Sequence, residues 1–193
     1  MACRQIDPCY ERVISGNRHN MTDSYSRAAN LLGALALAVC ETIREATQQQ
    51  ADGLAGSEPA ALVTLAHYPG QSIGDLARTL GLSHSGAVRL ADRLESAGLA
   101  SRTSPGPGRT LALYLTESGR AAARRVLARR QAAVEQLVSQ LEPGEEAALD
   151  QLAGQLLAAI TTDRASAHRL CRLCDEPLCA AVTRCPVDEA VDG

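Results

Sequence analysis

Apolar residues repeat at helical spacing in two long stretches that flank a shorter region of mixed pattern. The first stretch predicts one apolar helix face, and Thr22 or Ser24 can cap its start. We expect this helix to run to about Gln50, because Gly53 and Gly56 then interrupt the pattern. Its apolar positions are Leu31, Leu35, Val39 and Ile43.

The second stretch predicts two more long helices in the C-terminal part of the chain. Thr116 can cap a helix from Glu117 to about Leu141, and Pro143 opens another because proline suits the first helical turn. The apolar positions of the latter are Ala147, Leu149, Leu152, Leu156, Leu157 and Ile160. These helices carry more apolar surface than a small core covers, so together with the first helix they predict a dimerisation domain.

The mixed region between the long helices contains a helix-turn-helix pattern. Residues 72–83 predict a short helix, a turn at Gly81 and then Ser83, which can cap the next helix. We expect that helix to span residues 85–97. It carries Arg89 and Arg93 on one side and turns Val88, Leu90 and Leu94 toward a core.

A helix and a hairpin frame this pattern. Ser57, followed by Pro59, starts a helix through about His67, and residues 68–72 form a turn. Residues 99–115 predict a two-stranded hairpin with a Pro-Gly-Pro-Gly tip and a buried face made of Leu111, Leu113 and Leu115. The expected fold class is mainly α with a small β-hairpin wing: a winged helix-turn-helix flanked by long dimerisation helices.

Such a module inserts its second helix into a major groove and rests its wing on the neighbouring backbone or minor groove. We therefore expect a polar N-terminal arm (1–21), a dimerisation helix (22–56), a winged helix-turn-helix DNA-binding domain (57–119), C-terminal dimerisation helices (120–165) and a cysteine-rich metal-binding tail (166–193). A homodimer would place two recognition helices on a palindromic site in double-stranded DNA.

The distribution of charge favours binding to nucleic acid, although the net charge of the whole chain is −3. All 19 basic residues are arginine, and ten of them lie in residues 72–130 against four carboxylates, which makes this region locally +6 and the remainder −9. The first 20 residues are polar, and the most apolar run, residues 31–40, is too short to span a bilayer. A cytoplasmic protein with no membrane partner is expected.

With this order of elements, the chain resembles the multiple antibiotic resistance regulator (MarR) family over roughly residues 24–162. The matching segments are Pro-Gly-Gln-Ser-Ile-Gly-Asp-Leu-Ala (69–77), Leu-Gly-Leu-Ser (80–83), Asp-Arg-Leu-Glu (92–95) with Gly-Leu (98–99), Arg102, Arg109 and Leu-Tyr-Leu-Thr-Glu-Ser-Gly (113–119). The resemblance implies an obligate dimer that binds a palindromic operator, usually as a repressor.

The resemblance also points to the wing. Family wings commonly carry an aspartate two residues before the arginine that matches Arg109, but Pro107 stands there, so the usual ion pair to the body must be absent or rerouted. We expect Asp92 to orient Arg93 or a wing arginine instead. The candidate DNA-contacting residues are Ser72, Ser83, His84, Ser85, Gly86, Arg89, Arg93, Arg102 and Arg109.

The tail beyond this region carries four cysteines at C-x2-C-x4-C-x5-C spacing: Cys171, Cys174, Cys179 and Cys185. Four thiolates this close predict either a closed zinc site or an iron–sulfur cluster (2Fe–2S or 4Fe–4S), and the spacing leaves the two near parity. The ending, with Cys185 followed by proline, resembles the cluster-binding tail of redox-sensing regulators of the mercury-resistance family. His168 is an alternative ligand, and Cys3 and Cys9 could approach the tail, whereas Cys40 is expected to be buried.

Two regulatory hypotheses remain at this point. In the first, a homodimeric regulator, expected to be a repressor, senses redox state or metal through its cysteine tail. In the second, a small-molecule effector binds between the dimer and DNA lobes, and the tail is only a structural zinc site. An enzyme is not expected, because Cys-x-x-Cys lacks a strand–helix context and no phosphate loop or Ser-His-Asp arrangement stands out.

Overall fold

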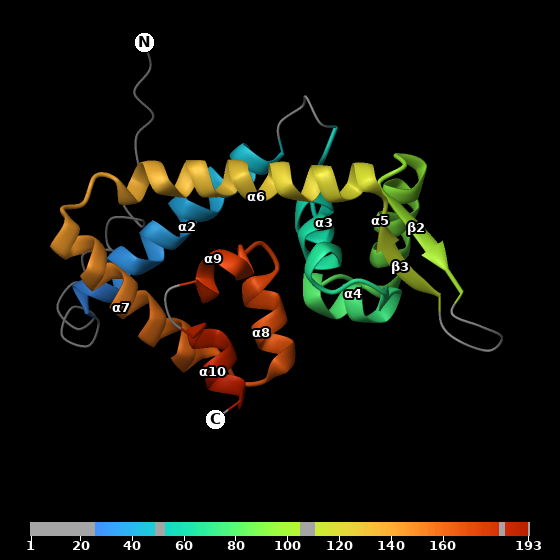
Figure 1. Cartoon of the computed structure of the whole chain (residues 1–193). Helices are drawn as coiled ribbons and strands as arrows, with labels where there is room; N and C mark the ends of the chain where they lie inside the picture. The colour runs from blue at the N-terminus through green and yellow to red at the C-terminus, as the bar shows by residue number, and fades with distance from the viewer. Residues whose placement is uncertain (1–25, 49–52, 105–110, 182–183, 193) are drawn as a thin grey trace, which may run out of the picture. The chain divides into compact units, whose positions relative to one another are not determined.

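The computed structural model describes residues 26–48, 53–104, 111–181 and 184–192, and Figure 1 shows them as helices with one small sheet. The chain divides into two compact units, Met1–Glu41 and Thr42–Gly193. Helix α2 (Arg27–Thr47) begins in the first unit, where Ser26 Oγ accepts a hydrogen bond from Ala29 N at 3.1 Å. The expected caps Thr22 and Ser24 lie outside the described residues, and the helix ends before Gln50.

The core of the second unit surrounds helix α3 (Glu58–His67), which is buried over most of its length and packs on α6 (Glu117–Val138). The core is built of leucine, valine and alanine side chains, consistent with a chain that has no Phe and no Trp. Leu90 and Leu94 are fully buried as predicted, whereas Val88 is only partly buried. The main core residues are Leu62, Val63, Leu65, Leu76, Leu90, Leu94, Leu113 and Val126.

The start of α3 corrects one expected cap. Pro59 stands in the first turn as predicted, but Ser57 forms no side-chain cap hydrogen bond to the residues described. Instead, Glu58 Oε2 accepts from the backbone N–H of Ala55 at 3.0 Å. This bond ties the preceding segment to the helix start, and the Glu58 carboxylate suits the positive end of the helix dipole.

The helix-turn-helix consists of α4 (Ile73–Leu80) and α5 (His84–Ser96). Ser72 and Asp75 form a reciprocal capping box at the start of α4, and Gly81 ends it with φ +66°. Ser83 caps α5 as predicted, accepting from Gly86 N at 3.1 Å. These local bonds fix both helix boundaries to within one residue of the sequence prediction.

The sheet has three strands rather than the expected two. β2 (Ala100–Thr103) and β3 (Ala112–Leu115) form the hairpin, and β1 (Gln71–Ser72) pairs with β3 from a segment interpreted as a turn. The buried face is also corrected, because Leu111 is 46% exposed whereas Ala112 is buried. The predicted alternation holds only over residues 113–115. The hairpin tip, residues 105–110, lies outside the described residues.

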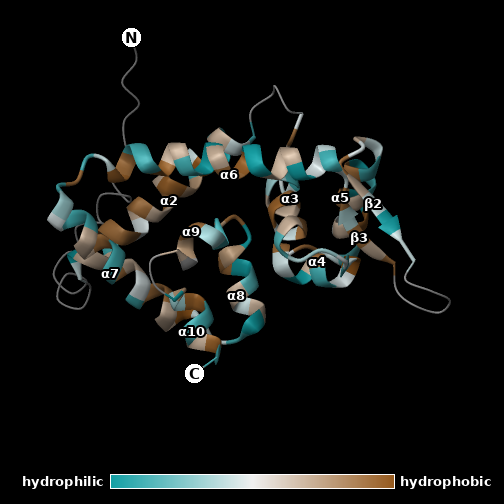
Figure 2. Cartoon of the chain, in the orientation of Figure 1, coloured by the Kyte–Doolittle hydropathy of each residue, from teal (hydrophilic) through white to brown (hydrophobic). Residues whose placement is uncertain are grey.

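The long C-terminal helices follow the predicted caps. Thr116 caps α6, accepting from Gly119 N at 3.0 Å, although the helix stops at Val138, before Leu141. Helix α7 (Pro143–Ile160) begins at the expected proline. Hydrophobic residues lie along both α2 and α7 (Figure 2). Each of these two helices exposes apolar side chains: Leu31, Leu32, Leu35 and Leu37 on α2, and Leu149, Leu152, Leu156, Leu157 and Ile160 on α7.

The cysteine-rich tail is helical. It forms α8 (Arg164–Cys171), α9 (Glu176–Ala180) and α10 (Pro186–Asp192). Asp163 caps α8, so the expected boundary at residue 166 falls inside this helix. Helix α10 packs on α7 and α8, and α8 packs on α4 of the helix-turn-helix. Within the described ranges, no helix is both long and apolar enough to cross a bilayer.

Candidate nucleic-acid interface and cysteine site

The first turn of α5 presents the side chains expected to read bases. Ser83, His84, Ser85 and Arg89 are exposed, and Gly86 is partly exposed. The Ser83 hydroxyl lies 3.3 Å from that of Ser85 while it caps the helix, so the two serines are held together. A short, polar first turn with an arginine one turn later fits the edge of a base pair in a major groove.

Arg93, further along α5, is bound to the body of the domain. Its Nε donates to Glu58 Oε1 at 2.6 Å, and the Glu58 side chain is only 9% exposed. The Arg93 side chain remains 56% exposed, so part of the guanidinium faces solvent. The pair joins the recognition helix to α3, and a phosphate contact by Arg93 stays a prediction.

Arg102 of the wing is held by two carboxylates of α5. Its guanidinium contacts Asp92 Oδ1 and Glu95 Oε2, both at 2.7 Å, and its side chain is 22% exposed. The expectation that Asp92 orients a wing arginine is therefore confirmed. This pair fixes the base of the wing on the recognition helix. Contact of Arg102 with DNA stays a prediction, and Arg109 and Pro107 lie outside the described residues.

Ser72 caps the start of α4. Its hydroxyl donates to Asp75 Oδ2 at 2.6 Å and accepts from Asp75 N at 3.1 Å. The bond from Ser72 is the main reason that the pKa of Asp75 lies below its usual value. With both bonds made, the hydroxyl has little capacity left for a phosphate, so its first role is to cap the helix.

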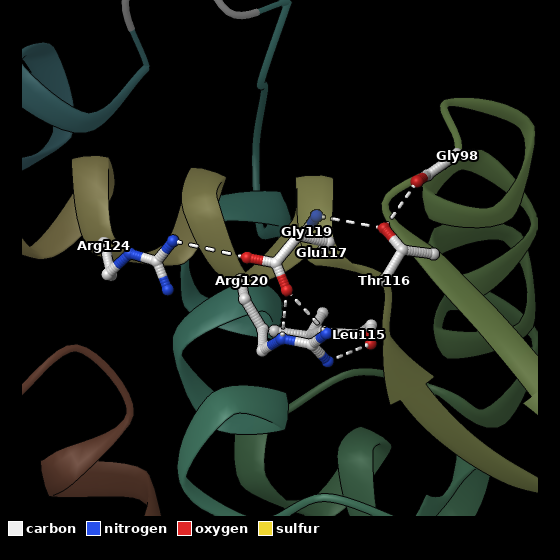
Figure 3. Close-up of polar contacts among 7 residues, drawn as sticks. All are labelled: Gly98, Leu115, Thr116, Glu117, Gly119, Arg120 and Arg124. Carbon is white, nitrogen blue, oxygen red and sulfur yellow. Dashed lines mark hydrogen bonds and ion pairs between the residues drawn. The ribbon is translucent and has the colours of Figure 1, made fainter.

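The wing is also joined to α6 by a group of short contacts, shown in Figure 3. Thr116 Oγ1 donates to Gly98 O at 2.7 Å, and Arg120 donates to Leu115 O at 2.9 Å. Glu117 pairs with Arg120 at 2.8 Å and lies 3.8 Å from Arg124. This joint connects the end of the recognition helix, the wing and the long helix.

The four tail cysteines line one cavity of about 450 Å³. Cys174 and Cys185 are the thiol neighbours that act on Cys179. Burial, followed by the neighbouring thiols Cys174 and Cys185, raises the pKa of Cys171 and of Cys179 to about 12. Burial also raises the pKa of Cys174, against the opposing charge of Arg130. Cys171, Cys174 and Cys179 are therefore protonated near neutral pH in metal-free protein.

The cysteines come together as the spacing suggested, but they do not form the closed ligand set that was expected. No group of three or more His, Cys, Asp or Glu side chains in the described part of the chain is placed to hold a metal ion. His168 lines the same cavity yet stacks on Tyr68, with ring centroids 4.6 Å apart. Cys40 is exposed on α2 rather than buried, and Cys3 and Cys9 lie outside the described residues.

Two residues at the end of α3, which the sequence did not single out, line this cavity. Tyr68 Oη donates to Glu176 Oε1 at 2.5 Å, and His67 Nε2 lies 3.0 Å from the carbonyl oxygen of Cys174. Burial and the bond to Glu176 raise the pKa of Tyr68 well above its usual value. The partners are more than a hundred residues apart in the chain, so no local pattern could have paired them.

Comparison with known proteins agrees with this architecture. Residues 52–110 match the model of the MarR family. The transcriptional repressor MprA of Escherichia coli (strain K12) is 37% identical over 103 residues, which cover 52% of this chain and 58% of that repressor. The chain thus spans less than two thirds of the curated relative that it matches.

Solved structures extend the match beyond the helix-turn-helix. The Mycobacterium tuberculosis MarR family protein Rv2887 in complex with DNA is 27% identical, covers 65% of this chain and 96% of that one, and has a TM-score of 0.54. A MarR family regulator from Rhodococcus sp. RHA1 is 26% identical, covers 70% and 96% of the two chains, and has a TM-score of 0.58. Residues 52–110 thus match the MarR family, and the mainly helical winged fold is similar to that of MarR family structures.

Proposed function

We propose that this protein is a homodimeric transcriptional regulator, acting as a repressor, that binds a palindromic operator in double-stranded DNA. The observation that carries the proposal is the exposed first turn of α5, with Arg89 beside it, on a helix fixed by a buried core and by the wing. A rigid helix with an exposed polar N-terminal turn is what major-groove reading requires. Repression rather than activation is supported by the similarity to MprA, which is named a transcriptional repressor.

Dimer formation is supported by the apolar faces of α2 and α7. Leu35 and Leu37 on α2 and Leu152 and Ile160 on α7 are each more than half exposed in the single chain. Water-exposed leucines at this density mark an interaction surface, because burying each one stabilises the assembly by roughly 1.5–3 kcal/mol. A twofold dimer repeats the recognition helix, so the site that it reads is palindromic.

The tail is proposed to hold an iron–sulfur cluster (2Fe–2S or 4Fe–4S) or zinc through Cys171, Cys174, Cys179 and Cys185. These thiols share one cavity, and soft thiolate donors suit both groups. Arg130 gives a second reason, because its Nε is buried without a hydrogen-bond partner among the described residues and its charge acts on Cys174. Four thiolates around a metal carry net negative charge, which a neighbouring guanidinium stabilises.

Between the two groups, the iron–sulfur cluster is the better candidate for a regulator. A cluster supplies a reversible redox change, whereas zinc supplies a fixed structural charge. We infer that loss or oxidation of the bound group weakens operator binding. Cys171, Cys174 and Cys179 would then return to the protonated, partly buried arrangement described above.

A small-molecule effector is the alternative, with the tail as a structural zinc site. A second cavity of about 480 Å³ lies between α4 and α8 and is lined by Gln71, Arg78 and His168 among others. Among similar structures, the MarR family protein Rv2887 is in complex with salicylic acid, and CouR from Rhodococcus jostii RHA1 is bound to p-coumaroyl-CoA. These ligands belong to those proteins, and only the position of the cavity favours an effector here.

One preparation tests both parts of the proposal. Protein purified without air is analysed by visible absorption and for iron, sulfide and zinc, and is then used to select duplexes from a random-sequence pool. We expect enrichment of palindromic duplexes whose affinity falls steeply with salt. Iron with sulfide would identify a cluster, and about one zinc per chain would identify a structural site. Absence of any selected duplex would overturn the DNA-binding proposal, and absence of both metals would overturn the cysteine site.

A further inference from the structure

The cysteine tail packs directly against the start of the DNA-reading module. Tyr68 is the residue that ends α3, and its hydroxyl donates to Glu176 at the start of α9. His67 contacts the same segment twice, through the carbonyl oxygen of Cys174, just before α9, at 3.0 Å and through Glu176 Oε2 at 3.6 Å. The ring of His168, from α8, covers the ring of Tyr68. Three parts of the tail thus hold two consecutive residues of the body.

The opposite side of the same segment is bound to the wing and to α4. The backbone N–H of Gly70 donates to Leu113 O at 2.9 Å, and Gln71 and Ser72 pair with β3. Ser72 then caps α4, the first helix of the helix-turn-helix. Residues 67–72 therefore form a short connection that contacts the tail at His67 and Tyr68 and the DNA-reading parts at Gly70, Gln71 and Ser72.

We propose that Glu176 and Tyr68 form a link that passes the state of the cysteine cavity to α4 and the wing within the same subunit. The proposal rests on the proposed function, because it concerns regulation by the same cysteine site. Glu176 stands between Cys174 and Cys179, within one turn of each, and Asp175 caps this turn by accepting from Leu178 N. A ligand that draws these thiols together changes the turn, and with it the carboxylate and the carbonyl that hold Tyr68 and His67.

A rival route runs through the long helices, since α10 packs on α7. It predicts that the polar contacts at Tyr68 matter only for stability. The two routes differ in one measurable respect: only the direct link makes the response to the cavity depend on the Tyr68 hydroxyl.

The test uses Tyr68→Phe in the full chain, which removes the hydroxyl and keeps the ring on His168. Glu176→Ala is the second variant, and Glu189→Ala, on the exposed side of α10, is its matched control. Each protein is prepared with zinc and after chelation, its zinc content is measured, and its affinity is determined for a duplex selected by the wild type. Amide hydrogen exchange of Ile73–Leu80 is recorded for both states as a readout that needs no DNA.

For the wild type and Glu189→Ala we expect affinities at least tenfold apart between the two states, and slower exchange in α4 with zinc bound. In Tyr68→Phe and Glu176→Ala the two states should differ by less than about twofold at unchanged zinc content. If zinc and duplex both bind but Tyr68→Phe keeps the full difference, the link is wrong and the proposed function stands. If no duplex binds, the proposed function fails and the exchange of α4 alone decides the link. If the wild type takes up neither zinc nor iron with sulfide, the cysteine site and the link fail together, and DNA binding is judged separately from the selected duplex.

Discussion

A Cβ atom added to Gly119 would lie 1.9 Å from the carbonyl oxygen of Leu99. This close approach lets the first turn of α6 lie against the backbone at the base of the wing, where Thr116 N donates to the same carbonyl at 3.0 Å. The joint shown in Figure 3 therefore depends on the absence of a side chain at one position. It matters for function because the recognition helix, the wing and the long helix meet there.

The first prediction concerns Gly119→Ala. The neighbour that a methyl group would meet is backbone and cannot move aside, so we expect a loss of about 3 kcal/mol or more in the free energy of unfolding. Gly144→Ala is the control, because nothing lies within 4 Å of the corresponding Cβ on α7. Urea unfolding at one fixed protein concentration measures both. Equal stability of the two variants would show that the joint is looser than the structure describes.

The second prediction concerns Arg93, which pairs with the nearly buried Glu58. Replacing Arg93 by alanine leaves that carboxylate without its partner, but the arginine is more than half exposed, so the expected loss is about 1–2 kcal/mol rather than the value for a fully buried pair. Glu58→Gln combined with Arg93→Ala should recover part of the loss in thermal or urea unfolding. A double variant no more stable than Arg93→Ala alone would argue against the pair.

The third prediction concerns Arg89 in the recognition helix. Because its side chain is exposed, Arg89→Ala should leave the unfolding free energy within about 0.5 kcal/mol of the wild type. If it reads a base edge, the variant should lose about 1–3 kcal/mol of binding to a selected duplex and become less selective at one base-pair position. Arg172→Ala, an exposed tail arginine, is the control. A uniform loss over all sequences would make Arg89 a phosphate contact.

The fourth prediction follows from the raised pKa of the tail thiols. Cys171 and Cys179, with pKa values raised to about 12 mainly by burial, stay protonated at pH 7 to 9 in metal-free protein, and the thiolate is the reactive form. Iodoacetamide should label the exposed Cys40 much faster than either residue over this pH range, as measured by mass spectrometry of peptides. Tail labelling as fast as that of Cys40 would contradict the buried, protonated arrangement.

The raised pKa values of these thiols also predict how the stability of the folded protein changes with pH. A thiol whose pKa is raised on folding stabilises the folded state fully below its unfolded pKa, near 9, and loses this contribution as pH rises toward 12. Metal-free wild type should therefore lose stability from about pH 9 upward, and Cys171→Ala should show a shallower decline. For the same reason zinc affinity should increase with pH, because binding must displace thiol protons.

Local chemistry determined much of this protein from sequence alone. The caps at Ser83 and Thr116 were predictable because each bonds to a backbone N–H three residues away, and Pro143 needs only its own fixed backbone angle to open α7. The burial of Leu90 and Leu94 follows from helical spacing. The family motifs, read in order, identified the winged fold and the residues of the recognition helix.

Tertiary structure decided the features that depend on partners far apart in the chain. Strand β1 forms because it pairs with the edge of β3. Arg93 pairs with Glu58, 35 residues earlier in the chain. Glycine is required at position 119 because the carbonyl oxygen of Leu99, 20 residues earlier, lies where a Cβ atom would be. The docking of the cysteine tail on Tyr68 joins groups 108 residues apart. Residue spacing specifies which atoms can meet within a turn or a strand, whereas contacts between elements depend on how the whole core packs, and no local pattern records that.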